Sequence, residues 1–136
     1  MRLKALTFAL ALIGAAGVAH AQESGFNLEL NNIKEIPQGC RVAFLASNQL
    51  GTTVQKLSVE IVVFDENSKV SDVVVFEFGR LPNGKSKVAQ FDLPRQCGSI
   101  SKLLLNNIKE CSGDKDIKQQ CEDRMKTTSR VNIAFE

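Results

Sequence analysis

The chain has 136 residues, and its 17 basic and 15 acidic side chains give a formal net charge of +2. It contains no tryptophan and no tyrosine, and its one histidine is His20, inside the N-terminal leader described next. Without that leader the charges balance and imidazole is absent, which argues against nucleic-acid binding, histidine catalysis and histidine metal sites.

The N-terminus predicts a cleavable secretory signal. Residues 1–4 are basic, residues 5–18 form an uncharged apolar run, and Ala19-His20-Ala21 fits the small-x-small rule for cleavage. The run is too short to span a bilayer. Because no twin-arginine pair is present, we expect export by the general secretory route to the periplasm or the exterior. A buried N-terminal helix is the less favoured alternative.

The expected mature chain is residues 22–136, after a signal peptide of residues 1–21. Its 115 residues suffice for one domain with one core. Arg2 and Lys4 leave with the signal, so 15 basic side chains then balance 15 acidic ones. We therefore expect a single β-sandwich domain that neither inserts into a membrane nor binds nucleic acid.

Four cysteines in an exported chain of this size predict two disulfides. Sequence alone permits three pairings, of which we favour Cys40–Cys97 with Cys111–Cys121. A redox pair or a thiolate metal site is the alternative, and the lack of any C-x-x-C spacing disfavours it.

Alternation of apolar and polar side chains dominates the mature chain and predicts seven strands. Turn-forming residues separate several of them, as at residues 65–68 and 82–84. The strands are expected at residues 26–30, 40–46, 57–63, 70–78, 86–93, 100–108 and 131–135.

One segment before the last strand has a helical period instead. Ile117, Cys121 and Met125 recur at intervals of four, and Asp114 is placed to cap the helix. The expected fold is therefore all-β, a seven-stranded antiparallel immunoglobulin-like sandwich with a short disulfide-stapled helical insert.

A hexapeptide occurs twice. Residues 30–35 and 105–110 both have the sequence LNNIKE, and a cysteine follows each. Because the flanking sequences differ, we expect two strands that end in similar turns rather than a duplication.

Residues 48–93 resemble the FxLYD group of small extracytoplasmic β-sandwich domains, in which an asparagine ends one strand and a Phe-x-Leu-Tyr-Asp strand follows. Here Asn48 and residues 61–65 (IVVFD) hold those places, followed by Lys69-Val70 and residues 84–86. The three named residues are replaced by others of similar character. The resemblance implies an accessory or interaction role and brings no active site.

The nearly continuous apolar stretch from Val73 gives the candidate binding surface. If its strand lies at a sheet edge, Val73, Val75, Phe76 and Phe78 could receive a partner strand. The favoured alternative is a strand covered on both faces. Nearby basic side chains could protect such an edge against pairing: Arg80, Lys85 and Lys87.

Two other clusters were weighed. Asp114, Asp116, Glu122 and Asp123 could suggest a cation site, but they lack calcium-loop spacing and favour a solvated helix face. The segment 95–99 and the helical insert are expected to form a surface fixed by both disulfides.

These patterns predict a non-catalytic periplasmic binding module, without a cofactor or metal, whose partner is another envelope protein. An enzyme inhibitor or a carboxylate-based enzyme is the first alternative, because carboxylates and projecting loops remain available. A small-ligand carrier is the second, and it would need an apolar cavity.

Overall fold

The computed structural model describes residue 17 and residues 24–136, so the predicted signal peptide, Gly17 apart, lies outside the described residues. The elements in chain order are β1 (Gly25–Ile36), β2 (Gly39–Gln49), β3 (Lys56–Asp65), β4 (Val70–Glu77), β5 (Ser86–Leu93), η1 (Cys97–Ser99), β6 (Ile100–Ser112), α1 (Lys118–Arg124), β7 (Met125–Ser129) and β8 (Ala134–Phe135).

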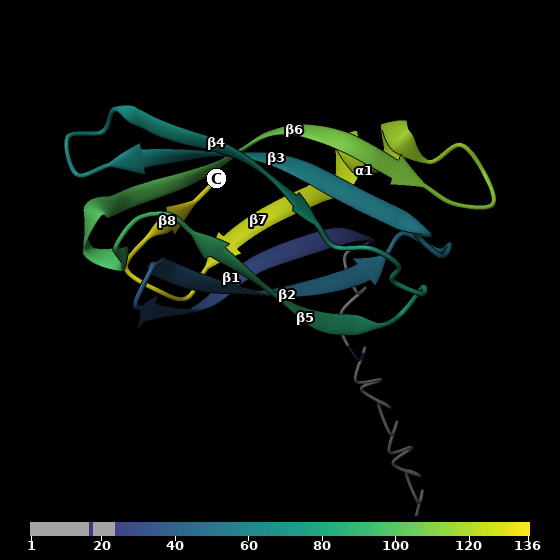
Figure 1. Cartoon of the computed structure of the whole chain (residues 1–136). Coiled ribbons are helices and arrows are strands. Elements are labelled where there is room, and N and C mark those ends of the chain that lie inside the picture. Colours follow the sequence, from purple (N-terminus) through teal and green to yellow (C-terminus); the bar gives the residue numbers. More distant parts are fainter. Residues whose placement is uncertain (1–16, 18–23) are drawn as a thin grey trace, which may run out of the picture.

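The strands form two four-stranded sheets, with the orders β5-β2-β1-β7 and β4-β3-β6-β8. Figure 1 shows the sheets as two layers, with α1 at one end. The all-β prediction is confirmed. Two strand pairs are parallel, β1 with β7 and β6 with β8, so the expectation of wholly antiparallel sheets was wrong for them. The described chain has eight strands rather than seven, because β7 precedes the expected last strand.

The core is one cluster of side chains contributed by both sheets. Leu28 and Val42 from one sheet and Ile61 and Leu103 from the other have no exposed surface. Each such side chain contributes about 1.5–3 kcal/mol through the apolar area it removes from water. Alternation therefore gives each of these strands one face in the core.

Phenylalanine rings fill the part of the core below the β4 and β5 edges. The ring of Phe44 lies 5.8 Å from both Phe76 and Phe78 and 5.2 Å from Phe135, between ring centroids. Phe76 on β4 also stacks on Phe91 of β5, with centroids 4.1 Å apart and planes 6° apart. These contacts join the edge strands of the two sheets.

The repeated hexapeptide forms a bulged strand in both places. In β1, Leu30 pairs with Phe44 and Asn32 with Ala43, so Asn31 is an extra residue. In β6, Asn106 is skipped in the same way. The first asparagine of each copy is therefore the bulge residue, and the strand continues past it, contrary to the turns expected there.

Each bulge asparagine donates its side-chain N–H to a glutamate. Asn31 bonds Glu29 at 2.8 Å, and Asn106 bonds Glu60 of the neighbouring strand at 2.6 Å. The extra residue shifts the apolar spacing from two to three, which keeps Ile33 and Ile108 directed toward the core.

Both disulfides join the cysteines favoured from the sequence, Cys40–Cys97 and Cys111–Cys121. The first connects β2 to η1, just before β6, and so links the two sheets. The second ties α1 to the end of β6. By loop-closure entropy they contribute about 4 and about 3 kcal/mol.

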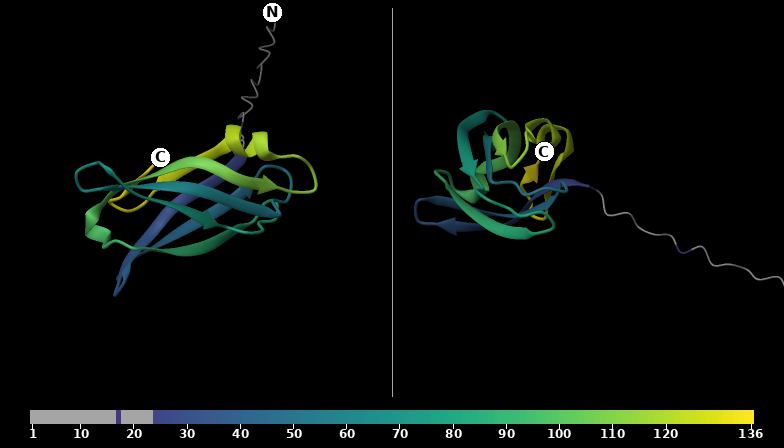
Figure 2. Two further views of the ribbon diagram at one scale, coloured as in Figure 1. Left: turned by 45° about the horizontal axis from the view of Figure 1, so that its top comes forward. Right: turned by 90° about the vertical axis from the view of Figure 1, so that its right-hand side faces the viewer.

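Helix α1 lies where the fourfold spacing predicted a helix, but its start differs. Ile117 is the N-cap and no side chain caps it, so the predicted Asp114 cap was wrong. Asp116 is nearer and its Oδ1 accepts the Lys118 N–H at 3.3 Å. Met125 already belongs to β7. Figure 2 shows α1 beside the start of β1.

Asn48 is the one buried polar residue in the described chain, and it ends β2. Its Nδ2 donates to the carbonyls of Thr52 and Leu81, both at 2.9 Å, and its Oδ1 accepts the Leu50 N–H at 3.0 Å. Every polar atom of the side chain is thus used. It ties the end of β2 to the connection that carries the chain from β4 to β5.

Candidate functional site

Strand β4 lies at the edge of its sheet and pairs on one side only, with β3. This meets the condition under which the sequence suggested a partner-strand surface. The alternative, a strand covered on both faces, was wrong. Bulges at both ends of the β3–β4 pairing leave a regular stretch between them.

Hydrogen bonds at the end of the pair establish which way the β4 backbone is directed. The Leu57 carbonyl accepts the Phe78 N–H at 2.8 Å, so Leu57 is directed toward β4. Backbone groups of an antiparallel strand point alternately to its two sides. The register therefore directs the N–H and C=O groups of Val73, Val75 and Glu77 toward the open edge.

The four candidate side chains divide between two faces of β4. Val73 and Val75 are 57% and 51% exposed on the outer face, whereas Phe76 and Phe78 are buried in the core. The structure thus does not bring the four together as one surface, because successive strand residues face opposite sides. Val70, which the candidate set omitted, is 60% exposed on the same strand.

The exposed valines continue into an apolar patch on the outer face of the sheet. Val62 of β3 pairs with Val73 and also with Leu104 of β6, so the three lie in one row. Val62 is 7% exposed although it is not part of the core cluster. We call Val62, Val73, Val75 and Leu104 the outer patch. Sequence reasoning missed Val62 and Leu104, since their pairing with β4 is not local.

The expected protective charges do not lie on β4. Arg80 and Lys85 belong to the connection and Lys87 to β5. The Arg80 Nε donates to the Gln55 side chain at 3.1 Å, and the Lys87 ammonium to the Arg80 carbonyl at 3.2 Å. Strand β4 itself carries no lysine, arginine or proline, the residues that commonly block edge pairing.

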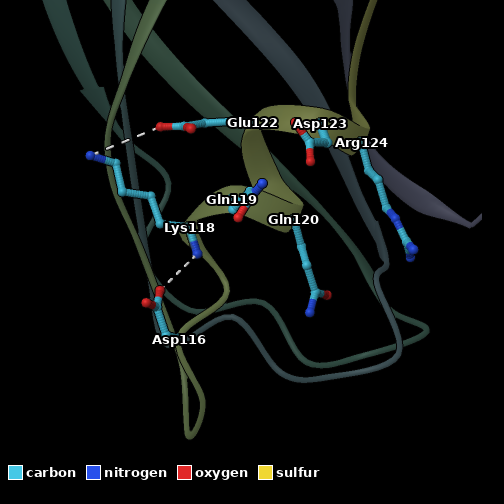
Figure 3. A pocket seen from close by; sticks show the side chains of 7 residues that line it. All are labelled: Asp116, Lys118, Gln119, Gln120, Glu122, Asp123 and Arg124. Atoms are coloured by element: carbon cyan, nitrogen blue, oxygen red, sulfur yellow. Dashed lines mark hydrogen bonds and ion pairs between the residues drawn. The ribbon is translucent and has the colours of Figure 1, made fainter.

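The surface of α1 offers no convergent group of side chains. A polar hollow of about 650 Å³ surrounds it, and Figure 3 shows its side chains diverging into solvent. Lys118 pairs with Glu122 at 3.9 Å along the helix. No group of three or more His, Cys, Asp or Glu residues in the described part of the chain could hold a metal ion.

The two disulfides lie at opposite ends of β6. Cys97 precedes the strand and Cys111 stands near its end. Thirteen residues of strand span roughly 40 Å. The expected common surface of residues 95–99 and the helical insert is therefore wrong, because a whole strand separates them.

Hydrogen bonds lower the pKa of three carboxyl groups. The Lys69 N–H holds down the pKa of Asp65 in the β3–β4 turn, and Arg41 does the same for Asp92 on β5. The Asn31 amide lowers the pKa of Glu29. These three belong to separate turns and strands and hold local structure.

No protein-family model, curated protein or solved structure matches the chain. Across residues 24–136, no helix is both long and apolar enough to cross a membrane.

Proposed function

We propose that this is an exported, non-catalytic binding module that engages another envelope protein by adding an extended segment of it to the open edge of β4. The observation that carries the proposal is the exposure of Val73 and Val75, each more than half, on a strand with one unpaired side. Strand addition would satisfy the free backbone groups and cover the outer patch together.

Export by the signal peptide to an oxidising compartment is part of the proposal. Two disulfides support it, since such bonds persist outside the cytoplasm. The missing imidazole of the mature chain and the diverging side chains around α1 support a role without catalysis.

For the fold, we propose an immunoglobulin-like sandwich related to the FxLYD domains. The orders β5-β2-β1 and β3-β6-β8 correspond to the strands E-B-A and C-F-G of that architecture, with β4 added beside the C strand. Asn48 at the end of β2 supports the FxLYD relationship. The parallel placement of β8 beside β6 departs from the pattern.

Site-specific photo-crosslinking in the native host tests the function. A photoreactive residue at position 75 should give a discrete crosslinked envelope protein. The matched control is position 88 on β5, where Val88 is 63% exposed on the other sheet. No product from position 75, or the same products from both positions, would overturn the proposal.

A further inference from the structure

The open edge of β4 ends in a carboxylate that nothing in the described chain neutralises. Val73, Val75 and Glu77 alternate along the strand, with backbone groups directed to the open side. Glu77 is exposed and makes no hydrogen bond or ion pair within residues 24–136. By contrast, Asp72 on the same strand is bound by Arg95 at 2.7 Å.

The surroundings of Glu77 are acidic overall. Ser58 of β3 pairs with Glu77 on one side and with Glu110 of β6 on the other, which places the two glutamates in one row across the sheet. They line a hollow of about 300 Å³ whose one cationic side chain is Lys56. A positively charged side chain arriving beside Glu77 would therefore find a complementary field.

We infer that the segment added to β4 carries a lysine or arginine opposite Glu77 and apolar, β-branched residues opposite Val75 and Val73. This inference rests on the proposed function and names the chemistry of its partner. For an antiparallel segment, the pattern from N- to C-terminus is basic-x-apolar-x-apolar. Opposite charges and β-branched pairs stabilise directly facing positions of neighbouring strands.

A second copy of the chain fits this edge less well. The run Val73-Val74-Val75 is symmetric, so two β4 strands could pair antiparallel about its centre. Glu77 would then face Ser71 of the other copy, or Val73 if the centre moved to Val75. Both arrangements leave two carboxylates without a cation, so charge complementarity favours a different, basic partner.

Peptide binding to the oxidised, exported protein tests the inference. Two labelled peptides differ in one residue, Arg-Thr-Val-Thr-Val and Glu-Thr-Val-Thr-Val at their centres, and fluorescence anisotropy measures Kd at low and at physiological salt. We expect the Arg peptide to bind about tenfold more tightly. Glu77→Arg should reverse that preference. Glu122→Arg on α1 is the matched charge-reversal control and should leave it unchanged.

Each other outcome is decisive. Equal binding of the two peptides, or a preference that Glu77→Arg does not alter, overturns the inference, as does binding of neither peptide. Dimers in sedimentation that Val75→Lys dissociates would assign the edge to a second copy instead. The crosslinks from position 75 decide the proposed function separately, so either idea can fail alone.

Discussion

Strands β4 and β5 are both open edges, joined by one connection and stacked through Phe76 and Phe91, yet they present different outer faces. On β5 the polar side chains are tied to β2: Ser86 bonds Ser47 at 2.7 Å, and Asp92 binds both ends of the Arg41 guanidinium at 2.7 and 2.9 Å.

On β4 the corresponding positions carry valines and no such ties. Val70, Val73 and Val75 are three of the four exposed large apolar side chains in the described chain, and the fourth is Val88 of β5. Solvation of an edge thus depends on which side chains its own sheet already binds. The polar edge is complete by itself, whereas the valine edge gains stability from another strand.

The largest effect is expected at the aromatic stack that joins the two edges. Phe76→Ala should cost about 3–5 kcal/mol in the free energy of unfolding, because its ring is buried against Phe44 and Phe91. Phe91→Ala should cost less, since that side chain is only partly buried. Urea denaturation measures both, and an equal or larger loss for Phe91→Ala would contradict the difference between the edges.

A smaller loss is expected where the connection between the edges is attached. Asn48→Ala removes the side chain that bonds Thr52, Leu81 and Leu50, and leaves buried backbone groups unpaired. It should lower the free energy of unfolding by about 1–3 kcal/mol. Asn83→Ala in the same connection is the control: its Oδ1 accepts one exposed bond from Gly51, so its loss should be near 0.5 kcal/mol.

Surface substitutions should separate the edges by solubility rather than by folding. Val75→Lys and Val88→Lys should each change the free energy of unfolding by no more than about 0.5 kcal/mol. Light scattering on concentrating the protein should fall clearly for Val75→Lys and little for Val88→Lys, because only the first places a charge among exposed valines. Equal changes would remove the distinction between β4 and β5.

The smallest effect concerns acid and salt. The pKa values of Asp65 and Asp92 lie below their ordinary 3.8, so their stabilisation is present above about pH 4 and is lost as pH falls through and below that value. Asp65→Asn and Asp92→Asn should each flatten the acid limb of stability in urea titrations.

Salt should distinguish the two carboxylates. Asp92 depends first on the exposed Arg41, so 0.5 M salt, on the order of a few ångströms of screening length, should weaken its contribution. Asp65 depends first on a backbone N–H of the β3–β4 turn and should be less sensitive. The same salt dependence for both would show that the causes are alike.

Strands with unbroken alternation were the predictable part of the fold. Leu57, Val59, Ile61 and Val63 alternate strictly, and β3 lies there. Strand β7 was missed because, after Met125, it contains only polar residues, and its place comes from parallel pairing with β1. No local pattern encodes that pairing.

The candidate site was predicted in part for a similar reason. The apolar run Val73-Val74-Val75-Phe76 is typical of a strand covered on both faces, yet β4 is an edge. Which residues of the run face outward follows from the pairing with β3, and Glu77 became part of the site only once that register was known.

The extra asparagine of β1 has a consequence for insertions and deletions. A strand is decoded in steps of two, and Asn31 acts as a one-residue frameshift between Leu30 and Ile33. Deleting it would bring Lys34 inward and turn Ile33 outward, so a change of one residue would rewrite the rest of the strand. The second copy of LNNIKE places Asn106 under the same constraint, so in these strands length is inherited as strictly as side-chain chemistry.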